Sequence, residues 1–228
     1  MSLNAKSAVW EQQRGDTADT MGRRAFIGLI SLSTLSGVLF MMLTSTLTRT
    51  VQFSGWTMVF ASLAFLGAVI VGSILINVTD NIPSALLGLA IITGVTGLYL
   101  GPLLAQEGDG VFGVFVLAAL VVVAFGIVGV LIPKDLTGWG GTLIASLLAV
   151  IVCMLATALL GMFGVETTGV MKLMDWVILI LFSVFVMYDF NRALRLPYTV
   201  INAVSVSASV FLDYVNIALS LLGIGNND

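Results

Sequence analysis

Long apolar stretches alternate with short polar segments along this chain of 228 residues. A helix needs about 20 mostly apolar residues to cross the hydrocarbon core of a bilayer. Five stretches meet that length without any charged residue, and two later stretches meet it with a few charges inside. The seven predicted spans are residues 25–48, 56–78, 83–105, 111–132, 142–163, 173–194 and 202–222. Because continuous apolar runs of this length form helices rather than barrel strands, we expect an all-α polytopic membrane protein.

The polar ends of the chain and its basic loops predict the domain organisation and the orientation. We expect residues 1–24 to form a cytosolic tail, residues 25–224 a seven-helix transmembrane domain and residues 225–228 a short C-terminal tail. Cytoplasmic loops of membrane proteins are enriched in Lys and Arg. An internal N-terminus places seven of the nine basic residues inside and two outside, and the inside residues are Lys6, Arg14, Arg23, Arg24, Lys134, Arg192 and Arg195. The sequence therefore predicts a cytosolic N-terminus, with Arg49 and Lys172 on the outer side.

Composition narrows the chemistry that this chain can carry. Charged residues make up only 9% of it and the net charge is −3, which is too weak and too dispersed for a nucleic-acid surface. Histidine is absent, and the single cysteine, Cys153, lies in an apolar run. Imidazole chemistry, His/Cys metal sites and intramolecular disulfides are therefore excluded. We expect no bound cofactor, and the lipid bilayer is the first expected partner.

Two aspartates lie inside the last two predicted spans. Burying an Asp at the centre of a membrane helix costs about 2.5–3.5 kcal/mol on insertion scales, so such residues are usually functional. Asp189 and Asp213 are 24 residues apart. In an antiparallel helical hairpin that turns near Ile201, they share the same depth. The sequence therefore predicts that the two carboxyl groups come within hydrogen-bonding reach in at least one state.

The polar residues of the last span fall on one face. They recur at intervals of three or four residues, which confines them to a narrow stripe on a helix. The stripe consists of Asn202, Ser205, Ser209, Asp213, Asn216 and Ser220. On the preceding span, Asp175 and Asp189 also fall close together in angle, with Arg192 one turn beyond. We expect the last two helices to face each other along these residues.

Two interpretations of the aspartate pair stay open at this point. Two carboxyl groups in contact at low dielectric cannot both ionise easily, so they are expected to share a proton, and the pair is a candidate pH sensor. Alternatively, a buried hydrogen bond between them, or between Asp189 and Arg192, only locks two helices together.

The residues around the aspartates resemble a known family. The stretches LFSVFVMYDFN at residues 181–191 and DYVN at residues 213–216 are similar to the signature of the transmembrane Bax inhibitor motif family, of the bacterial type. The resemblance implies a seven-helix fold whose last helix is central and wrapped by two layers of three, in a plasma or inner membrane. It also implies a pH-sensitive calcium leak, in which Asp189 and Asp213 are the paired aspartates. By the same resemblance, we expect their hydrogen bond to close the path and their ionisation state to gate it.

The sequence departs from the family pattern in one respect. Family members in which the aspartate pair closes the path, as a latch, also supply an arginine from the second helix. In this chain, residues 56–78 contain no charge. Arg49, in the preceding loop, and Arg192 are the candidates to replace it. The departure bears on the gating model more than on the fold.

Three functional hypotheses follow from these residues. In the first, Asp189 and Asp213 gate a proton-regulated cation path and supply oxygen ligands to calcium. The further candidate residues for the path or its latch are Tyr188, Arg192, Ser209 and Asn216. In the second, the chain conducts no ions and regulates a membrane protease or the cell-survival machinery, with purely structural aspartates.

The third hypothesis is an intramembrane aspartyl protease. Tyr188 and Asp189 match the first motif of those enzymes. Their second motif requires glycines where Val210 and Leu212 stand. We therefore expect a protein that is not an enzyme.

Overall fold

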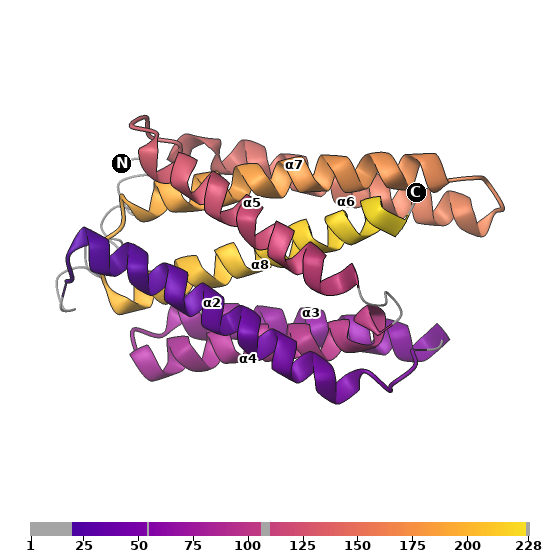
Figure 1. The fold of residues 1–228 in the computed structure, drawn as a ribbon, viewed down its shortest axis with the longest axis horizontal. Helices are drawn as coiled ribbons and strands as arrows, with labels where there is room; N and C mark the ends of the chain where they lie inside the picture. The colour runs from indigo at the N-terminus through magenta and orange to yellow at the C-terminus, as the bar shows by residue number, and fades with distance from the viewer. Residues whose placement is uncertain (1–19, 54, 106–109, 227–228) are drawn as a thin grey trace, which may run out of the picture. The chain divides into compact units, whose positions relative to one another are not determined.

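The computed structural model describes residues 20–53, 55–105 and 110–226. Within these ranges the chain is helical throughout, with short connections and no strand. Its elements are α2 (Arg23–Thr48), α3 (Gly55–Val78), α4 (Ile82–Leu104), α5 (Val111–Leu131), the 3-10 helix η2 (Thr137–Trp139), α6 (Gly140–Met162), α7 (Thr168–Ala193) and α8 (Val200–Asn226). The seven α-helices are each long and apolar enough to cross a membrane (Figure 1). The all-α class and the seven predicted spans are confirmed.

Most helices begin and end within two residues of the predicted spans, and α7 is the main exception. It begins at Thr168 rather than near residue 173, because the prediction stopped at the charge of Lys172. Glu166 supplies the start signal, since its Oε1 accepts a hydrogen bond from the Thr168 N–H at 3.1 Å. An acidic side chain that accepts from a first-turn N–H favours a helix start at this point. The last helix, α8, continues to Asn226.

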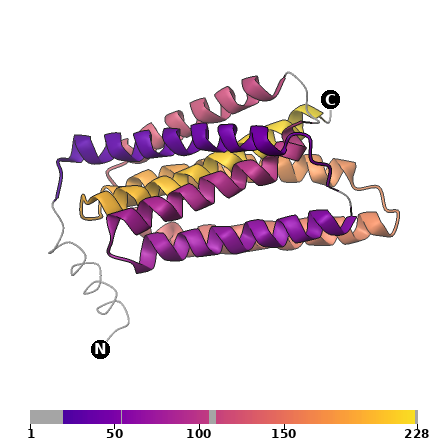
Figure 2. The same cartoon turned by 90° about the horizontal axis from the view of Figure 1, so that it is seen from below.

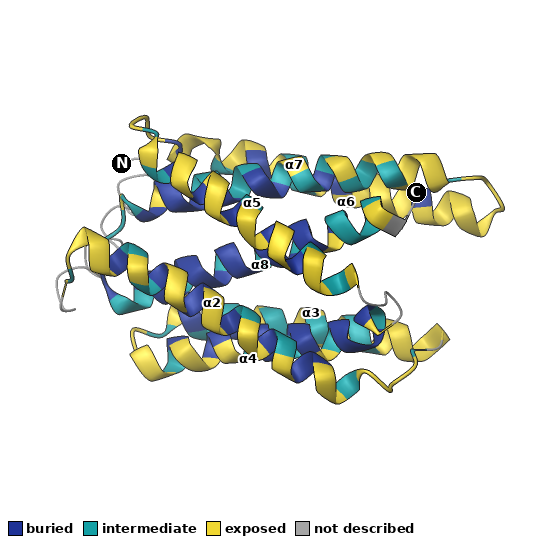
Figure 3. Cartoon of the chain, viewed as in Figure 1, coloured by how far each residue is buried: buried dark blue, intermediate teal, exposed yellow. Residues whose placement is uncertain are grey.

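The helices divide into two compact units, which share α8. The first unit contains α2, α3, α4 and α8 as far as Phe211. The second contains α5, η2, α6, α7 and α8 from Leu212. Buried residues follow α8 along most of its length, whereas much of α3 is exposed (Figure 3). The last helix thus contributes buried residues to both units.

Small residues bring the backbones of α2 and α4 together in the first unit. A Cβ atom at Gly97 of α4 would overlap the carbonyl of Met41 on α2, and one at Gly101 would overlap the carbonyl of Ser45. Such close approach is what small residues at four-residue spacing permit between membrane helices. On its other side α4 packs along α3, which Figure 2 shows beside it. Glycine on α4 is therefore a packing requirement.

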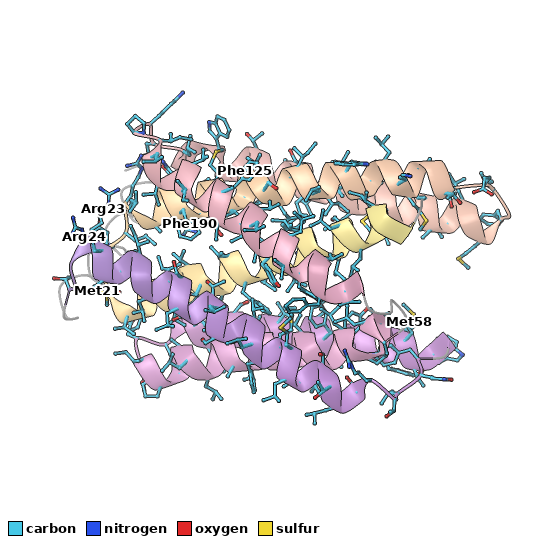
Figure 4. The ribbon with its side chains drawn as sticks, in the orientation of Figure 1. Met21, Arg23, Arg24, Met58, Phe125 and Phe190 are labelled. Atoms are coloured by element: carbon cyan, nitrogen blue, oxygen red, sulfur yellow. The ribbon has the colours of Figure 1, made fainter. Side chains whose placement is uncertain are left out.

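The start of α2 lies against the turn that precedes α8. The backbone N–H of Met21 donates to the Tyr198 carbonyl at 2.9 Å, and the rings of Phe26 and Tyr198 stack with centroids 4.9 Å apart. Arg23 and Arg24 are exposed at this end of α2 (Figure 4). The first helix and the α7–α8 turn therefore share one end of the first unit.

Candidate functional site

Asp189 of α7 and Asp213 of α8 are both buried in the second unit. Their side chains are 7% and 5% exposed, respectively. The two helices flank a short turn at residues 194–199, close to the turn predicted near Ile201. The two carboxyl groups lie near enough to interact electrostatically. The pair that the sequence singled out is therefore assembled from two helices of one unit.

One oxygen of this pair has no hydrogen-bond partner. The Oδ2 atom of Asp213 is fully buried and accepts no hydrogen bond. Buried polar atoms in folded proteins almost always have a partner, because an unsatisfied one costs about 1–3 kcal/mol. The direct hydrogen bond between the two carboxyl groups stays a prediction. The buried carboxyl group of Asp213 is therefore energetically costly, which suggests that it has a functional role.

A second contact between α7 and α8 shows how the two helices run relative to each other. The carboxyl group of Asp175 packs directly on Gly223, where an added Cβ atom would lie 2.7 Å from the carboxyl carbon. Asp175 precedes Asp189 by 14 residues on α7, while Gly223 follows Asp213 by 10 residues on α8. Contacts that run in opposite senses along two helices are those of an antiparallel pair. Within the second unit, α7 and α8 therefore face each other at Asp175. The predicted stripe does not face α7 throughout, because Ser205, in the first-unit part of α8, donates to the Asn77 Oδ1 of α3 at 3.0 Å.

Tyr188 and Arg192 lie beside the pair on α7. The hydroxyl of Tyr188 lies at the start of α6, where a Cβ atom added to Gly140 would come within 2.6 Å of it. Arg192 is exposed, and its charge acts on both Asp189 and Tyr188. Asp135, in the loop after α5, also acts on Tyr188. One positive and one negative group therefore face this end of α7.

Asn191, two residues beyond Asp189, is a buried polar residue to which the sequence analysis gave no role. It is 1% exposed. Its Oδ1 accepts from the Leu136 N–H at 3.0 Å, and its Nδ2 donates to the carbonyls of Gly129 at 3.3 Å, Ile132 at 3.0 Å and Lys134 at 3.1 Å. The sequence signal for this role was Pro133, which lacks the N–H that would otherwise donate to the Gly129 carbonyl. That carbonyl therefore needs a donor from elsewhere.

The family can be stated with this geometry in place. The family model described as "Inhibitor of apoptosis-promoting Bax1" matches residues 23–227, which include every described helix. The chain belongs to this family. The family is not an enzyme family, and the resemblance of residues 181–191 and 213–216 is confirmed.

Bacterial relatives agree with the assignment to the Bax inhibitor family. An uncharacterized membrane protein of Streptococcus pyogenes serotype M6 is 31% identical over 179 residues, which cover 72% of this chain and 75% of the relative. A protein of the same description from serotype M1 matches with the same identity and coverage. An integral membrane protein is thus shown, and bacterial relatives point to the plasma membrane.

The other predicted residues of this Bax inhibitor family chain fall in different places. Asn216 lies in the second unit and donates through Nδ2 to the Leu212 carbonyl at 2.8 Å. Ser209 is half-buried on the part of α8 that belongs to the first unit. Arg49 is exposed at the end of α2, also in the first unit. Of the candidates to replace the family arginine, Arg192 is therefore the one in the same unit as the aspartates.

No ready-made metal cluster surrounds the aspartates. Among the described residues, no three His, Cys, Asp or Glu side chains come together in a way that could hold a metal ion. A calcium ion at this pair would therefore need neutral oxygens to complete its six to eight ligands. Outside the spans, the hydroxyl and N–H of Thr168 hold the pKa of Glu166 below its usual range. Glu166 consequently stays ionised between pH 5 and 8 and contributes no titration there.

Proposed function

We propose that this Bax inhibitor family protein is a proton-regulated leak path for calcium, with Asp189 and Asp213 as its sensor. The observation that carries the proposal is the fully buried Oδ2 atom of Asp213, which has no partner although a second buried carboxyl group lies close by. A pair retained only to lock two helices is expected to satisfy its polar atoms, because each orphan weakens the lock. An unsatisfied oxygen is better explained by a group that changes partners.

The two protonation states of the pair have opposite effects on α7 and α8. When one carboxyl group is protonated, its O–H can donate to the other, and this bond holds the helices together and closes the path. When both groups are ionised, they repel each other and offer oxygens to a hard cation. Low pH therefore favours the closed state and higher pH the open one.

The groups that face the pair set the balance between these states. Arg192 interacts electrostatically with Asp189, and Asp189 interacts electrostatically with Asp213. Tyr188 also interacts with Asp189, and Asp135 interacts with Tyr188. The chain has no histidine, so carboxyl groups must supply any response between pH 5 and 8.

Neutral oxygens for a bound calcium ion are proposed from α8. The side-chain oxygen of Asn216, three residues after Asp213, is the nearest candidate along the helix. Its amide nitrogen already donates to Leu212, which leaves the oxygen as the group that could bind a cation. Ser209 stays a prediction from the sequence. The proposed orientation is an N-terminus in the cytosol.

Calcium influx into liposomes tests this function. Purified protein is reconstituted around a fluorescent calcium indicator, and influx is recorded from pH 5 to pH 8 beside protein-free liposomes. The proposal predicts influx above that of protein-free liposomes, rising with pH. A helical, folded protein that passes no calcium at any pH would contradict it. The second hypothesis, a non-conducting regulator of membrane protein partners, then takes its place.

A further inference from the structure

The end of α5 is capped by a side chain from α7. Helix α5 ends at Leu131, and Pro133 follows two residues later. The last carbonyls of a helix lack donors from their own helix, and at Gly129 the residue four positions on is the proline, which has no N–H. The Asn191 amide donates to that carbonyl at 3.3 Å and to the carbonyl of Ile132 at 3.0 Å. One α7 side chain thus replaces donors that the α5 sequence cannot supply.

The same amide also holds the loop that leads to α6. Its nitrogen donates to the Lys134 carbonyl at 3.1 Å, and its Oδ1 accepts from the buried N–H of Leu136 at 3.0 Å. An amide NH₂ has two protons, so its three carbonyl partners share them in a three-centre arrangement. All hydrogen-bonding groups of the Asn191 side chain are therefore engaged with residues 129–136.

Backbone contacts around Asp189 reinforce this attachment. A Cβ atom at Gly129 would overlap the Met187 carbonyl, so α5 touches the α7 backbone directly. A Cβ atom at Gly126 would lie 2.9 Å from the ring of Phe190, which is labelled in Figure 4 with Phe125 of α5. The Tyr188 hydroxyl contacts Gly140. The neighbours of Asp189 on both sides are thus held by α5 and by the start of α6.

We propose that Asn191 is a positioning residue, which ties the α5–α6 loop to the turn of α7 that carries Asp189. The proposal rests on the function assigned above to the aspartate pair. Asn191 lies two residues from Asp189, so a change in the loop at residues 132–136 moves the carboxyl group relative to Asp213. The loop therefore sets the pH at which the path opens, together with the groups that face the pair, Arg192 and Tyr188.

Two substitutions of Asn191 separate its donors from its acceptor. Asn191→Leu removes all four hydrogen bonds while keeping the number and branching of the side-chain heavy atoms. Asn191→Asp keeps an acceptor for the Leu136 N–H but removes the amide donors, and it serves if the leucine variant does not fold. The matched control is Ser183→Ala, because Ser183 is a buried residue of α7 whose hydroxyl donates to the Leu179 carbonyl within the same helix.

Hydrogen exchange at the Leu136 amide tests the attachment without any ion flux. Loss of one buried hydrogen bond opens such an amide roughly fivefold more often, since its net contribution is about 1 kcal/mol. We expect that increase in Asn191→Leu, a smaller one in Asn191→Asp and none in Ser183→Ala. An unchanged exchange rate in Asn191→Leu would show that the side chain does not hold the loop.

The pH profile of calcium influx tests the positioning role. We expect the midpoint to move by at least half a pH unit in both Asn191 variants and to stay in place in Ser183→Ala. Faster exchange at Leu136 with an unmoved midpoint would overturn the role, leaving a cap that serves the fold alone. A wild type without influx at any pH rejects the function of the pair, and the positioning role with it, whereas the exchange data still decide whether the cap exists.

Discussion

Single polar atoms decide most of what distinguishes this chain from an ordinary helical bundle. The Oδ2 atom of Asp213 is buried without a partner, while all four hydrogen-bonding groups around Asn191 are satisfied across two helices and a loop. A membrane interior penalises both kinds of residue unless they are paired. The end of α5 accounts for the burial of Asn191, whereas no hydrogen bond among the described residues satisfies the Oδ2 atom of Asp213.

Replacing Asp213 with asparagine should raise stability, because it removes a buried group that becomes charged as the pH rises. At pH 8 we expect the free energy of unfolding to rise by about 1–3 kcal/mol, because a neutral amide avoids the desolvation of a charge at this buried position. At pH 5, where the wild-type carboxyl group is more often neutral, the gain should be smaller. Thermal unfolding in detergent measures it.

Asp175→Asn provides the comparison for this measurement. Asp175 is only half-buried on α7, so its replacement should change stability less. A lower melting temperature for Asp213→Asn at pH 8 would mean that the carboxylate is stabilised by groups other than those described.

The sequence predicted the aspartates of this site but not the role of Asn191. Asp189 and Asp213 stand out because a charge in an apolar run is conspicuous, and simple hairpin geometry gives their depth. Asn191 lies in the same stretch, but its role depends on which backbone carbonyls of the α5 end and the following loop lie next to its side chain. A proline such as Pro133 marks the end of a helix in the sequence, whereas only the packed structure shows which side chain supplies the missing donor.

Glycine at the helix contacts governs packing at the scale of the elements. On α5, Gly129 touches the backbone of α7, whereas Gly113 has open space around its α-carbon. The apolar pattern predicted α5 as a helix but did not distinguish these two glycines. The distinction comes from the approach of a neighbouring helix, which is a tertiary property.

Substitution of these two glycines by alanine should therefore have opposite effects. Gly129→Ala forces a methyl group against the Met187 carbonyl and should cost about 1–3 kcal/mol, the usual penalty for overpacking. Gly113→Ala should be neutral or slightly stabilising, because alanine is the better helix former. Thermal unfolding of the two variants checks this, and equal effects would rule out the close α5–α7 approach.

At the scale of the whole molecule, the basic residues predict a topology that the contacts within each unit support. In the first unit, Met21 binds the carbonyl of Tyr198, so the start of α2 and the α7–α8 turn share one end. In the second unit, Asn191 binds the α5–α6 loop that carries Lys134, so that loop lies at the end of α7 where Arg192 stands. The segments predicted to be cytosolic are thus neighbours within each unit.

Labelling of single cysteines tests the orientation of the chain in the membrane. In a Cys153→Ser background, Lys134→Cys and Val165→Cys place thiols on exposed residues of two different loops. With a cytosolic N-terminus, an impermeant maleimide added outside intact cells should label the Val165→Cys variant only, and Lys134→Cys should react after lysis. The reverse pattern would mean an external N-terminus.

The central claim is that the aspartate pair confers pH dependence on a calcium path, and calcium influx in matched single-carboxyl variants tests it most directly. Wild type, Asp213→Asn and Glu166→Gln are reconstituted at equal density and compared at pH 5.5 and pH 7.5. Glu166 is the control, because it is an exposed carboxyl group outside the spans that stays ionised at both values. The account predicts greater influx at pH 7.5 for wild type and Glu166→Gln, and loss of most of that difference in Asp213→Asn. An Asp213→Asn variant that keeps both the influx and its pH difference would contradict the account.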